Sequence, residues 1–453
     1  TRDRASNMVE GETSNMNSLM QEYANVMAED SEISLPPYVD SVLPIAPEIA
    51  DGMIPVKWNG SNWVKTTVSD DEWYDYANKE WANVVLGDST FNEDGTLNEN
   101  LPYSMLVWIP RYAYQITSQY HTATSNAGNI NIVFIDTNNQ NKTKTTTYSE
   151  TYPSYSTGSG MEDYVVHPAF NYGGTKLNGF WVGKYETSHT GCTTDESTGE
   201  ASYTGNEIIQ IKAGVTSWRN IQVSDIFIAC TNMNANSDNP YGLNTNDNAV
   251  DPHMMKNSEW GAVAYLSQNT TYGKNNEVWE NSNINYITGQ AGSSVNENSS
   301  GVTYAYNANN GQQASTTGNV TGIYDMSGGA WEYVAAYVDN ENSNLETYGS
   351  NLRDAADKYK DIYSVEITDS FTNNYIVSTP ENGYYGDAIY EISSNSDALS
   401  WYNDYANFPY SGSAFFYRGG GYAGTTGVGI FSFSRRNGEK VENYGFRLVI
   451  SLL

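Results

Sequence analysis

Short hydrophobic runs alternate with loops rich in Asn, Ser, Thr and Gly along most of the chain. The runs at 106–110 and 180–183 have the length and composition typical of strands buried in a sheet. Two longer stretches, 217–230 and 257–267, carry apolar residues at helical spacing, and the second has Glu259 in its first turn. Two helices among many short strands predict an α+β fold with an irregular antiparallel sheet and long loops.

The N-terminal part of the chain has its own pattern. Residues 1–34 are predicted to hold an amphipathic helix, because apolar side chains recur at intervals of three or four between Met8 and Met27. A proline-containing linker follows at 35–52. We interpret the helix as the remnant of an anchor or stalk, with Thr1 as a processed or truncated start. A helix packed on its own domain is the alternative.

A small β unit is predicted next, at 53–100, where two strands flank the hairpin signal Asn59-Gly60. It contains four tryptophans within about 25 residues, which favours the core of a small sheet over a ligand-binding box. These are Trp58, Trp63, Trp73 and Trp81. The rest, 101–453, is predicted to be one larger domain with an insertion at about 339–408, where strong strand signals are few.

Composition narrows the function classes. The 453 residues include 22 Lys and Arg against 53 Asp and Glu, a net charge of −31. Such a charge repels phosphate backbones and anionic lipids and so argues against a chain that as a whole binds nucleic acid or a membrane surface. With 37 Tyr, 11 Trp and 12 Phe, the chain is too aromatic for a disordered acidic tail. Two Cys and four His are too few for a Cys/His metal cage or a disulfide-dense scaffold. We expect an extracellular protein.

Several motifs follow one another in a recognisable order. They are Val107-Trp108-Ile109-Pro110, His167-Pro168, Gly179 to Glu186, Ser258-Glu259-Trp260-Gly261, Gly322 to Val334, Tyr417-Arg418-Gly419-Gly420-Gly421-Tyr422 and Gly445-Phe446-Arg447-Leu448-Val449. This order resembles the formylglycine-generating-enzyme-like branch of the C-type-lectin fold, over most of 101–453. The resemblance implies a packed structural hub built from Trp260, Trp331, Glu332, Arg418, Gly419, Gly420, Phe446 and Arg447.

The enzymatic branches of this family need residues that the chain lacks. The oxidase branch holds copper with a pair of C-terminal cysteines, but Cys192 and Cys230 both lie far upstream. These two are interpreted as buried small hydrophobic residues or as one disulfide. The sulfoxide-synthase branch needs three histidine ligands for iron, whereas the four histidines here are scattered: His121, His167, His189 and His253. No catalytic residues and no metal ligands are predicted.

The ligand-binding branch fits best. It includes the variable proteins of diversity-generating retroelements and related bacterial surface and phage-tail proteins, which display binding side chains between the Arg-Gly-Gly and Gly-Phe-Arg motifs. Here the resemblance implies solvent-facing ligand-binding positions at Tyr417, Tyr422, Ala423, Thr425, Thr426, Ser432, Ser434, Arg435 and Arg436. Val428, Ile430, Phe431 and Phe433 are expected in the core. The stretch holds little Asn, unlike the diversified relatives.

Charge singles out the same region independently. Residues 411–453 contain five basic and two acidic side chains, a balance of +3, while the remaining residues carry 17 basic and 51 acidic ones, or −34. An acidic ligand would be steered to such a patch. For Arg418 and Arg447 we favour a structural role, in which they bind buried carbonyls or the carboxylate of Glu332. For Arg435 and Arg436 the structural and ligand-binding interpretations stay open.

No cofactor is expected, although one loop offers oxygen ligands for Ca²⁺; a solvated loop is the favoured alternative. Its residues are Asn244, Asn246, Asp247, Asn248 and Asp251. The leading hypothesis is a non-enzymatic protein displayed on a bacterial surface, pilus or phage tail, which binds a protein or glycan ligand on a host or target cell and no nucleic acid. Relatives suggest a pilin-like tether through a removed hydrophobic N-terminal helix. The alternatives are a structural pilus or fibre subunit that forms homo-oligomers or filaments, and a formylglycine-generating-type oxidase.

Overall fold

The computed structural model describes residues 44–87, 90–192, 203–233, 243, 249–295, 302–365, 369–424 and 427–453, all within one compact unit, Ser41–Leu453. The predicted helix at 1–34 lies outside these residues, as do Thr425, Thr426 and the Asx residues at 244 and 246–248. Within the described part, four α-helices accompany many strands that pair mostly antiparallel. The α+β prediction is therefore confirmed.

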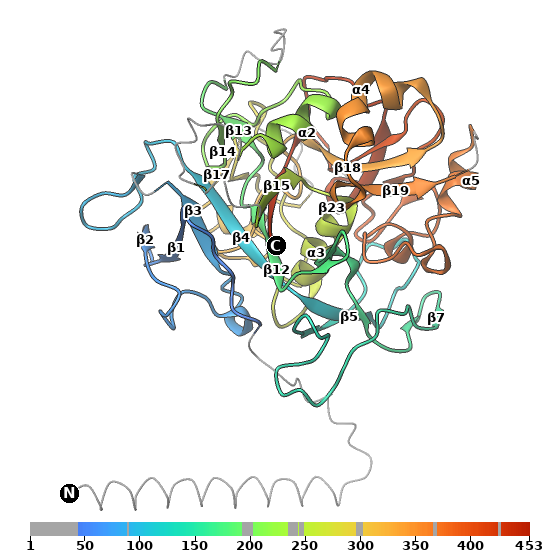
Figure 1. The fold of residues 1–453 in the computed structure, drawn as a ribbon, viewed down its shortest axis with the longest axis horizontal. Helices are drawn as coiled ribbons and strands as arrows, with labels where there is room; N and C mark the ends of the chain where they lie inside the picture. Colours follow the sequence, from blue (N-terminus) through green and yellow to red (C-terminus); the bar gives the residue numbers. More distant parts are fainter. Residues whose placement is uncertain are drawn as a thin grey trace, which may run out of the picture. The chain divides into compact units, whose positions relative to one another are not determined.

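The first large sheet joins strands from both ends of the chain (Figure 1). In spatial order it contains β15 (Val250–Met254), β25 (Leu448–Leu452), β12 (Gly179–Gly183), β4 (Ser104–Pro110), β3 (Asn83–Leu86), β1 (Met53–Trp58) and β2 (Trp63–Lys65). The Trp-rich segment supplies β1, β2 and β3, and β3 pairs antiparallel with β4. Trp63, Trp73 and Trp81 are buried, as expected for core residues, whereas Trp58 is only half-buried.

The second large sheet carries the C-terminal motifs. Its strands run in the order β19 (Asp361–Ser364), β18 (Trp331–Asp339), β22 (Phe415–Gly419), β23 (Gly429–Arg436), β21 (Tyr405–Asn407) and β20 (Asp397–Leu399), and β24 (Tyr444–Phe446) also pairs with β18. The 339–408 segment provides β19, β20 and β21. It therefore extends the sheet at both edges around the three strands β18, β22 and β23.

The described residues also form several smaller sheets. A three-stranded sheet contains β6 (Ile130–Phe134), β5 (Tyr112–Ile116) and β9 (Val165–Val166). Four two-stranded ladders are formed by β7 (Tyr155–Ser156) with β8 (Gly160–Met161), β10 (Asn171–Tyr172) with β11 (Thr175–Lys176), β13 (Ser188–His189) with β14 (Ile209–Gln210), and β16 (Gln290–Ala291) with β17 (Tyr304–Ala305).

The helices are short and packed onto the sheets. They are α2 (Val223–Thr231), α3 (Asn257–Gln268), α4 (Ser343–Asp354) and α5 (Phe371–Tyr375). The prediction of α3 is confirmed, and Glu259 caps this helix by accepting a hydrogen bond from the Lys256 amide at 2.8 Å. Helix α2 packs against α4 (Figure 1).

The predicted start of α2 is wrong. The helix begins at Val223, six residues later than the hydrophobic pattern suggested. Asn220 has a φ of +59°, a left-handed conformation that a right-handed helix cannot contain. The Trp218 amide instead donates to the Thr187 carbonyl, so Trp218 reaches the core from an extended segment.

Candidate ligand-binding site

Four aromatic side chains gather around Trp331 on the second large sheet, and we call them, together with the nearby Tyr422, the aromatic face. The four are Trp331 (β18), Tyr405 (β21), Tyr417 (β22) and Tyr444 (β24), and Tyr422 follows Gly421, which packs against Trp331. The Trp331 and Tyr417 ring centroids are 4.8 Å apart at a steep angle, and Tyr417 and Tyr444 are also 4.8 Å apart. Edge-to-face contacts of this kind hold the rings in fixed orientations.

Three of these rings are half-buried and one is clearly exposed. Trp331, Tyr417 and Tyr422 belong to the half-buried group, Tyr405 is 39% exposed, and Tyr444 is buried at 5%. The Tyr405 ring lies 6.5 Å from that of Trp331. The face therefore presents large, rigid aromatic surface to solvent above a buried support.

Small residues let the chain pass close to Trp331. A side chain at Gly421 would place its Cβ 2.9 Å from Trp331 Nε1, so only glycine fits there without displacing the indole. The next residue, Tyr422, donates its amide to the Gly329 carbonyl at 2.8 Å. Its ring packs edge-to-face on Tyr286 at 4.9 Å, which brings Tyr286 to the rim of the face.

Two arginines lie over aromatic rings in this region: Arg436, which is partly exposed, and Arg219, which is fully buried. The Arg436 guanidinium is 5.3 Å from the Tyr444 ring centroid and forms an ion pair with Glu439 at 3.0 Å. The Arg219 guanidinium lies 3.8 Å from the Tyr286 centroid and donates to the Glu442 carbonyl. Tyr and Arg are the side chains most enriched at binding hot spots.

The structure brings some of the predicted site residues together and separates others. Tyr417 and Arg436 both contact the Tyr444 ring, whereas the Tyr422 ring contacts Tyr286, and Ala423 is exposed beside Tyr422. Arg435 points to the opposite side of β23, where its guanidinium lies 4.8 Å from both the Phe371 and Tyr410 rings. Thr425 and Thr426 lie outside the described residues.

The expectation that Ser432 and Ser434 face solvent is wrong. They are 0% and 6% exposed, because β23 is an internal strand between β22 and β21 and Tyr417 stands directly opposite Ser434. The core positions expected on the same segment are confirmed. Val428, Ile430, Phe431 and Phe433 are at most 4% exposed.

Sequence reasoning missed two members of the aromatic face as ligand contacts. Tyr405 and Tyr444 stood in no candidate set, and Trp331 was assigned to the structural hub alone. The missing signal was long-range pairing, since β21 joins β23 and β24 joins β18 across wide gaps in the sequence. Tyr444 does precede the Gly-Phe-Arg motif directly, which is the one local clue the sequence offered.

Apart from Trp331, which is half-buried, the predicted hub residues are buried. Arg447 Nη2 donates to Glu332 Oε1 at 2.5 Å and to the Tyr324 carbonyl at 3.0 Å. Arg418 donates to the carbonyls of Asp387 and Ala388. These contacts agree with the structural interpretation of both arginines. Burial raises the pKa of Glu332 to about 7, against the opposing attraction of Arg447.

These buried pairs weaken the argument from local charge. Without Arg418 and Arg447, the surface of 411–453 keeps three basic and two acidic side chains, a balance of +1. Arg435 also lies 3.5 Å from Asp397, and Arg436 is paired with Glu439. Aromatic contact, rather than positive charge, is therefore the dominant property of the face.

The part of the chain that the structure describes contains no cluster of side chains suited to bind a metal ion. No group of three or more His, Cys, Asp or Glu side chains there could hold a metal ion. Cys192 and Cys230 are not joined by a disulfide in the structure, and Cys230 is buried. Two of the histidines are buried inside the protein. His253 Nε2 lies 2.9 Å from Glu259 Oε1. Burial lowers the pKa of His167 to about 3.

No helix within the described residues has the length and apolar character to cross a membrane.

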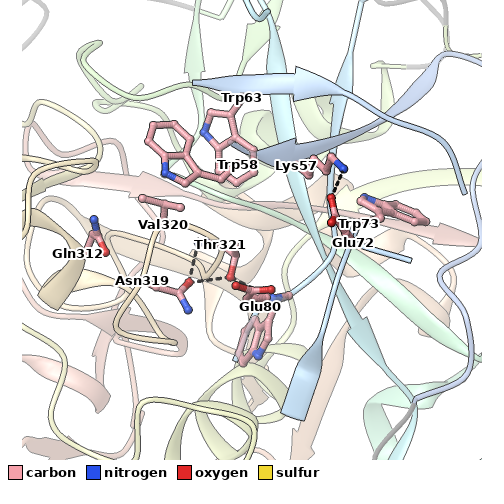
Figure 2. A pocket seen from close by; sticks show the side chains of 11 residues that line it. Lys57, Trp58, Trp63, Glu72, Trp73, Glu80, Gln312, Asn319, Val320 and Thr321 are labelled. Carbon is pink, nitrogen blue, oxygen red and sulfur yellow. Dashed lines mark hydrogen bonds and ion pairs between the residues drawn. The ribbon is translucent and has the colours of Figure 1, made fainter. Parts of the chain in front are cut away.

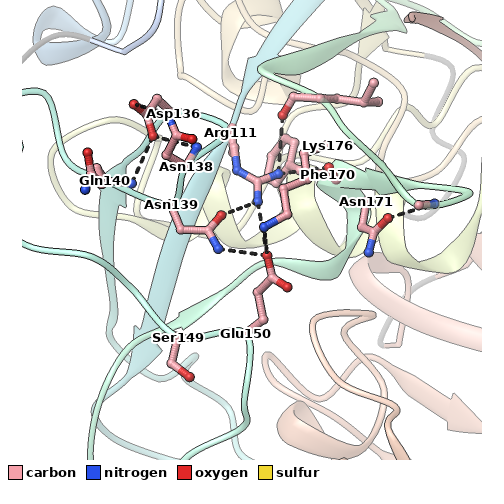
Figure 3. Close-up of polar contacts among 12 residues, drawn as sticks. Arg111, Asp136, Asn138, Asn139, Gln140, Ser149, Glu150, Phe170, Asn171 and Lys176 are labelled. Carbon is pink, nitrogen blue, oxygen red and sulfur yellow. Dashed lines mark hydrogen bonds and ion pairs between the residues drawn. The ribbon is translucent and has the colours of Figure 1, made fainter.

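A second polar cluster surrounds the buried Arg111 (Figure 3). Its Nη1 donates to the Phe170 carbonyl at 2.8 Å and its Nη2 to Asn139 Oδ1 at 2.5 Å. Glu150 joins the cluster by accepting from Asn139 at 2.7 Å and pairing with Lys176 at 2.6 Å. These bonds tie the 136–150 excursion to the β10–β11 hairpin, so we assign the cluster a structural role.

No protein-family model matches the chain, and no curated protein matches it.

Proposed function

We propose that this protein is a non-enzymatic, ligand-binding protein of the C-type-lectin fold, in its formylglycine-generating-enzyme-like branch. The observation that carries the proposal is the aromatic face, where Trp331, Tyr405, Tyr417 and Tyr422 expose rigid rings beside Arg436. Rings of this kind give large contact area at a low cost in conformational entropy, as in antibody paratopes. The ordered C-terminal motifs support the fold assignment.

The ligand is a protein or glycan on a host or target cell, and the setting is extracellular, on a bacterial surface, pilus or phage tail. The weak local charge supports a ligand recognised by stacking and hydrogen bonding more than by ionic attraction. Phenol groups at Tyr405, Tyr417 and Tyr422 supply both donors and acceptors for that purpose. The balance of contacts makes binding only modestly dependent on salt.

Binding of the purified protein to glycan arrays, mucins and intact cells tests the proposal. We expect saturable binding to one class of target at both about 50 mM and about 500 mM NaCl, because aromatic contacts are not screened by salt. Binding that disappears at the higher salt would indicate ionic attraction and contradict the assigned contacts. Absence of binding to every target, together with ordered filaments in electron micrographs, would favour a fibre subunit instead.

A further inference from the structure

A separate pocket of about 170 Å³ lies at the edge of the first large sheet (Figure 2). Its walls come from β1 and β2, from the segment that joins β2 to β3, and from the 312–321 segment. Four tryptophans and three ionisable side chains line it, together with Gln312, Asn319, Val320 and Thr321. None of these residues belongs to the aromatic face.

The tryptophans form a rigid aromatic lining. Trp58 and Trp63 meet edge-to-face, with centroids 5.5 Å apart and planes at 66°, so two walls of the pocket form a corner. The indole N–H of Trp73 donates to the Asn83 carbonyl at 2.9 Å, and that of Trp81 donates to the Tyr272 carbonyl at 2.7 Å. Trp58 is half-buried and gives a ligand direct access to an indole.

The charges at the pocket are unbalanced toward the negative side. Lys57 is its one lining cation, and its ammonium is already held by Asp70 at 2.8 Å and Glu72 at 2.7 Å. Glu80 also lines the pocket, and its carboxylate has no hydrogen bond or ion pair to any residue that the structure describes. Counting the Lys184 ammonium near Trp63 as well, two cations stand against the carboxylates of Glu72, Glu80 and Asp70, which leaves one negative charge in excess near the indoles.

The polar groups on the opposite wall have little to offer a neutral polyol. The Asn319 amide donates to the Lys79 carbonyl at 3.0 Å and accepts from Thr321 at 2.7 Å. These committed groups leave the aromatic surface and the Glu80 carboxylate as the main binding features. Both of these features attract cations.

We propose that this pocket binds an organic cation, a methylated quaternary ammonium group, between Trp58, Trp63 and Glu80. Tryptophan faces attract a cation through the ring quadrupole, and a methylated ammonium sheds water at a lower cost than an inorganic ion. One of these indoles, that of Trp63, already has a lysine of the protein beside it, because Lys184 Nζ lies 4.9 Å from its ring centroid. The large negative charge of the chain concentrates cations around it.

Choline and its neutral isostere 3,3-dimethyl-1-butanol test the proposal directly, because they share a shape and differ in charge. Ligand-observed NMR on the full chain should give a Kd of about 1 mM for choline, a value typical of a small ligand in an open site, and at least about tenfold weaker binding of the isostere. Equal binding of the two compounds, preferential binding of free monosaccharides, or no choline binding up to about 10 mM would overturn the proposal.

Variants locate the site. Glu80→Gln should weaken choline binding about fivefold and Trp58→Ala about tenfold, with Trp58→Phe between Trp58→Ala and the unmodified protein. Glu162→Gln, an exposed carboxylate outside the pocket, should leave the Kd unchanged. Because Glu80 is exposed, its variant keeps the fold, and an unchanged melting temperature checks this. A choline Kd that none of the pocket variants alters would also overturn the assignment.

The ammonium can come from several sources, and further arms of the same titration separate them. Phosphocholine, choline-headgroup vesicles and a trimethyl-lysine peptide carry the same cationic group on different carriers. Tighter binding of one carrier than of choline identifies the natural source. Because this pocket is separate from the aromatic face, failure here leaves the proposed function untouched.

Discussion

The buried carboxyl of Asp387 should make the stability of the protein depend on pH. The carboxyl is buried at 4% exposure, accepts a hydrogen bond from the Tyr363 hydroxyl at 2.7 Å, and accepts another from the Ile389 amide at 3.1 Å. Burial nevertheless raises its pKa from 3.8 to about 7. The folded protein therefore holds this proton at pH values where the unfolded chain has lost it, so stability falls as pH rises between those two values.

The magnitude follows from the same two pKa values. At about 1.4 kcal/mol per pH unit, the difference between 3.8 and about 7 corresponds to about 4 kcal/mol in total, of which about 3 kcal/mol is lost between pH 5 and pH 8. Asp387→Asn keeps an acceptor for the Ile389 amide but cannot ionise. Urea titrations at pH 5 and pH 8 should show a free energy of unfolding that drops by about 3 kcal/mol less in this variant than in the unmodified protein.

A second variant should change the pH dependence of stability in the opposite direction from Asp387→Asn. The Tyr363 hydroxyl lowers the pKa of Asp387 through its hydrogen bond, so Tyr363→Phe should raise that pKa further and steepen the loss of stability toward pH 8. Equal pH dependence in the unmodified protein and Asp387→Asn would refute the reasoning. A shallower dependence in Tyr363→Phe would refute it as well.

Two further variants and one labelling experiment test the packing of the fold. Arg447→Met leaves the buried Glu332 carboxylate unpaired and should cost about 3–5 kcal/mol in urea unfolding, and recovery of part of the loss in a double variant with Glu332→Gln is the control. Gly261→Ala should lower the melting temperature although alanine favours helices, because its Cβ would lie 1.9 Å from the Gly386 carbonyl oxygen; a higher melting temperature would contradict this contact. Iodoacetamide should label Cys192 alone in the native protein, since Cys230 is buried and burial raises the pKa of its thiol; intact mass would show two labels if that burial is wrong.

Local pattern was sufficient for some elements and insufficient for others. Helix α3 could be predicted because its apolar stripe and the capping Glu259 are both encoded within one segment. The start of α2 could not be predicted. Trp218 is buried through contacts outside the helix, and the left-handed backbone at Asn220 prevents the helix from beginning earlier.

The candidate site shows the same division. Motif order singled out Tyr417 and Tyr422, and both side chains are half-buried at the two ends of a short, glycine-rich turn. Separation of Arg435 from Arg436 follows from strand alternation, but only once β23 is known to be a strand through this pair. Contact between Trp331 and Tyr405 depends on the order of strands in the sheet, which no local pattern records.

Equilibrium binding of three matched proteins tests the aromatic face most directly. These are the unmodified chain, the triple variant Tyr417→Ala/Tyr422→Ala/Arg436→Ala, and Arg435→Ala, whose side chain lies on the opposite side of β23. On the target class identified by the binding panel, the account predicts a loss of at least about 100-fold for the triple variant and a change within about twofold for Arg435→Ala. Binding by a folded triple variant that equals the unmodified protein, or an equal loss in Arg435→Ala, would contradict it.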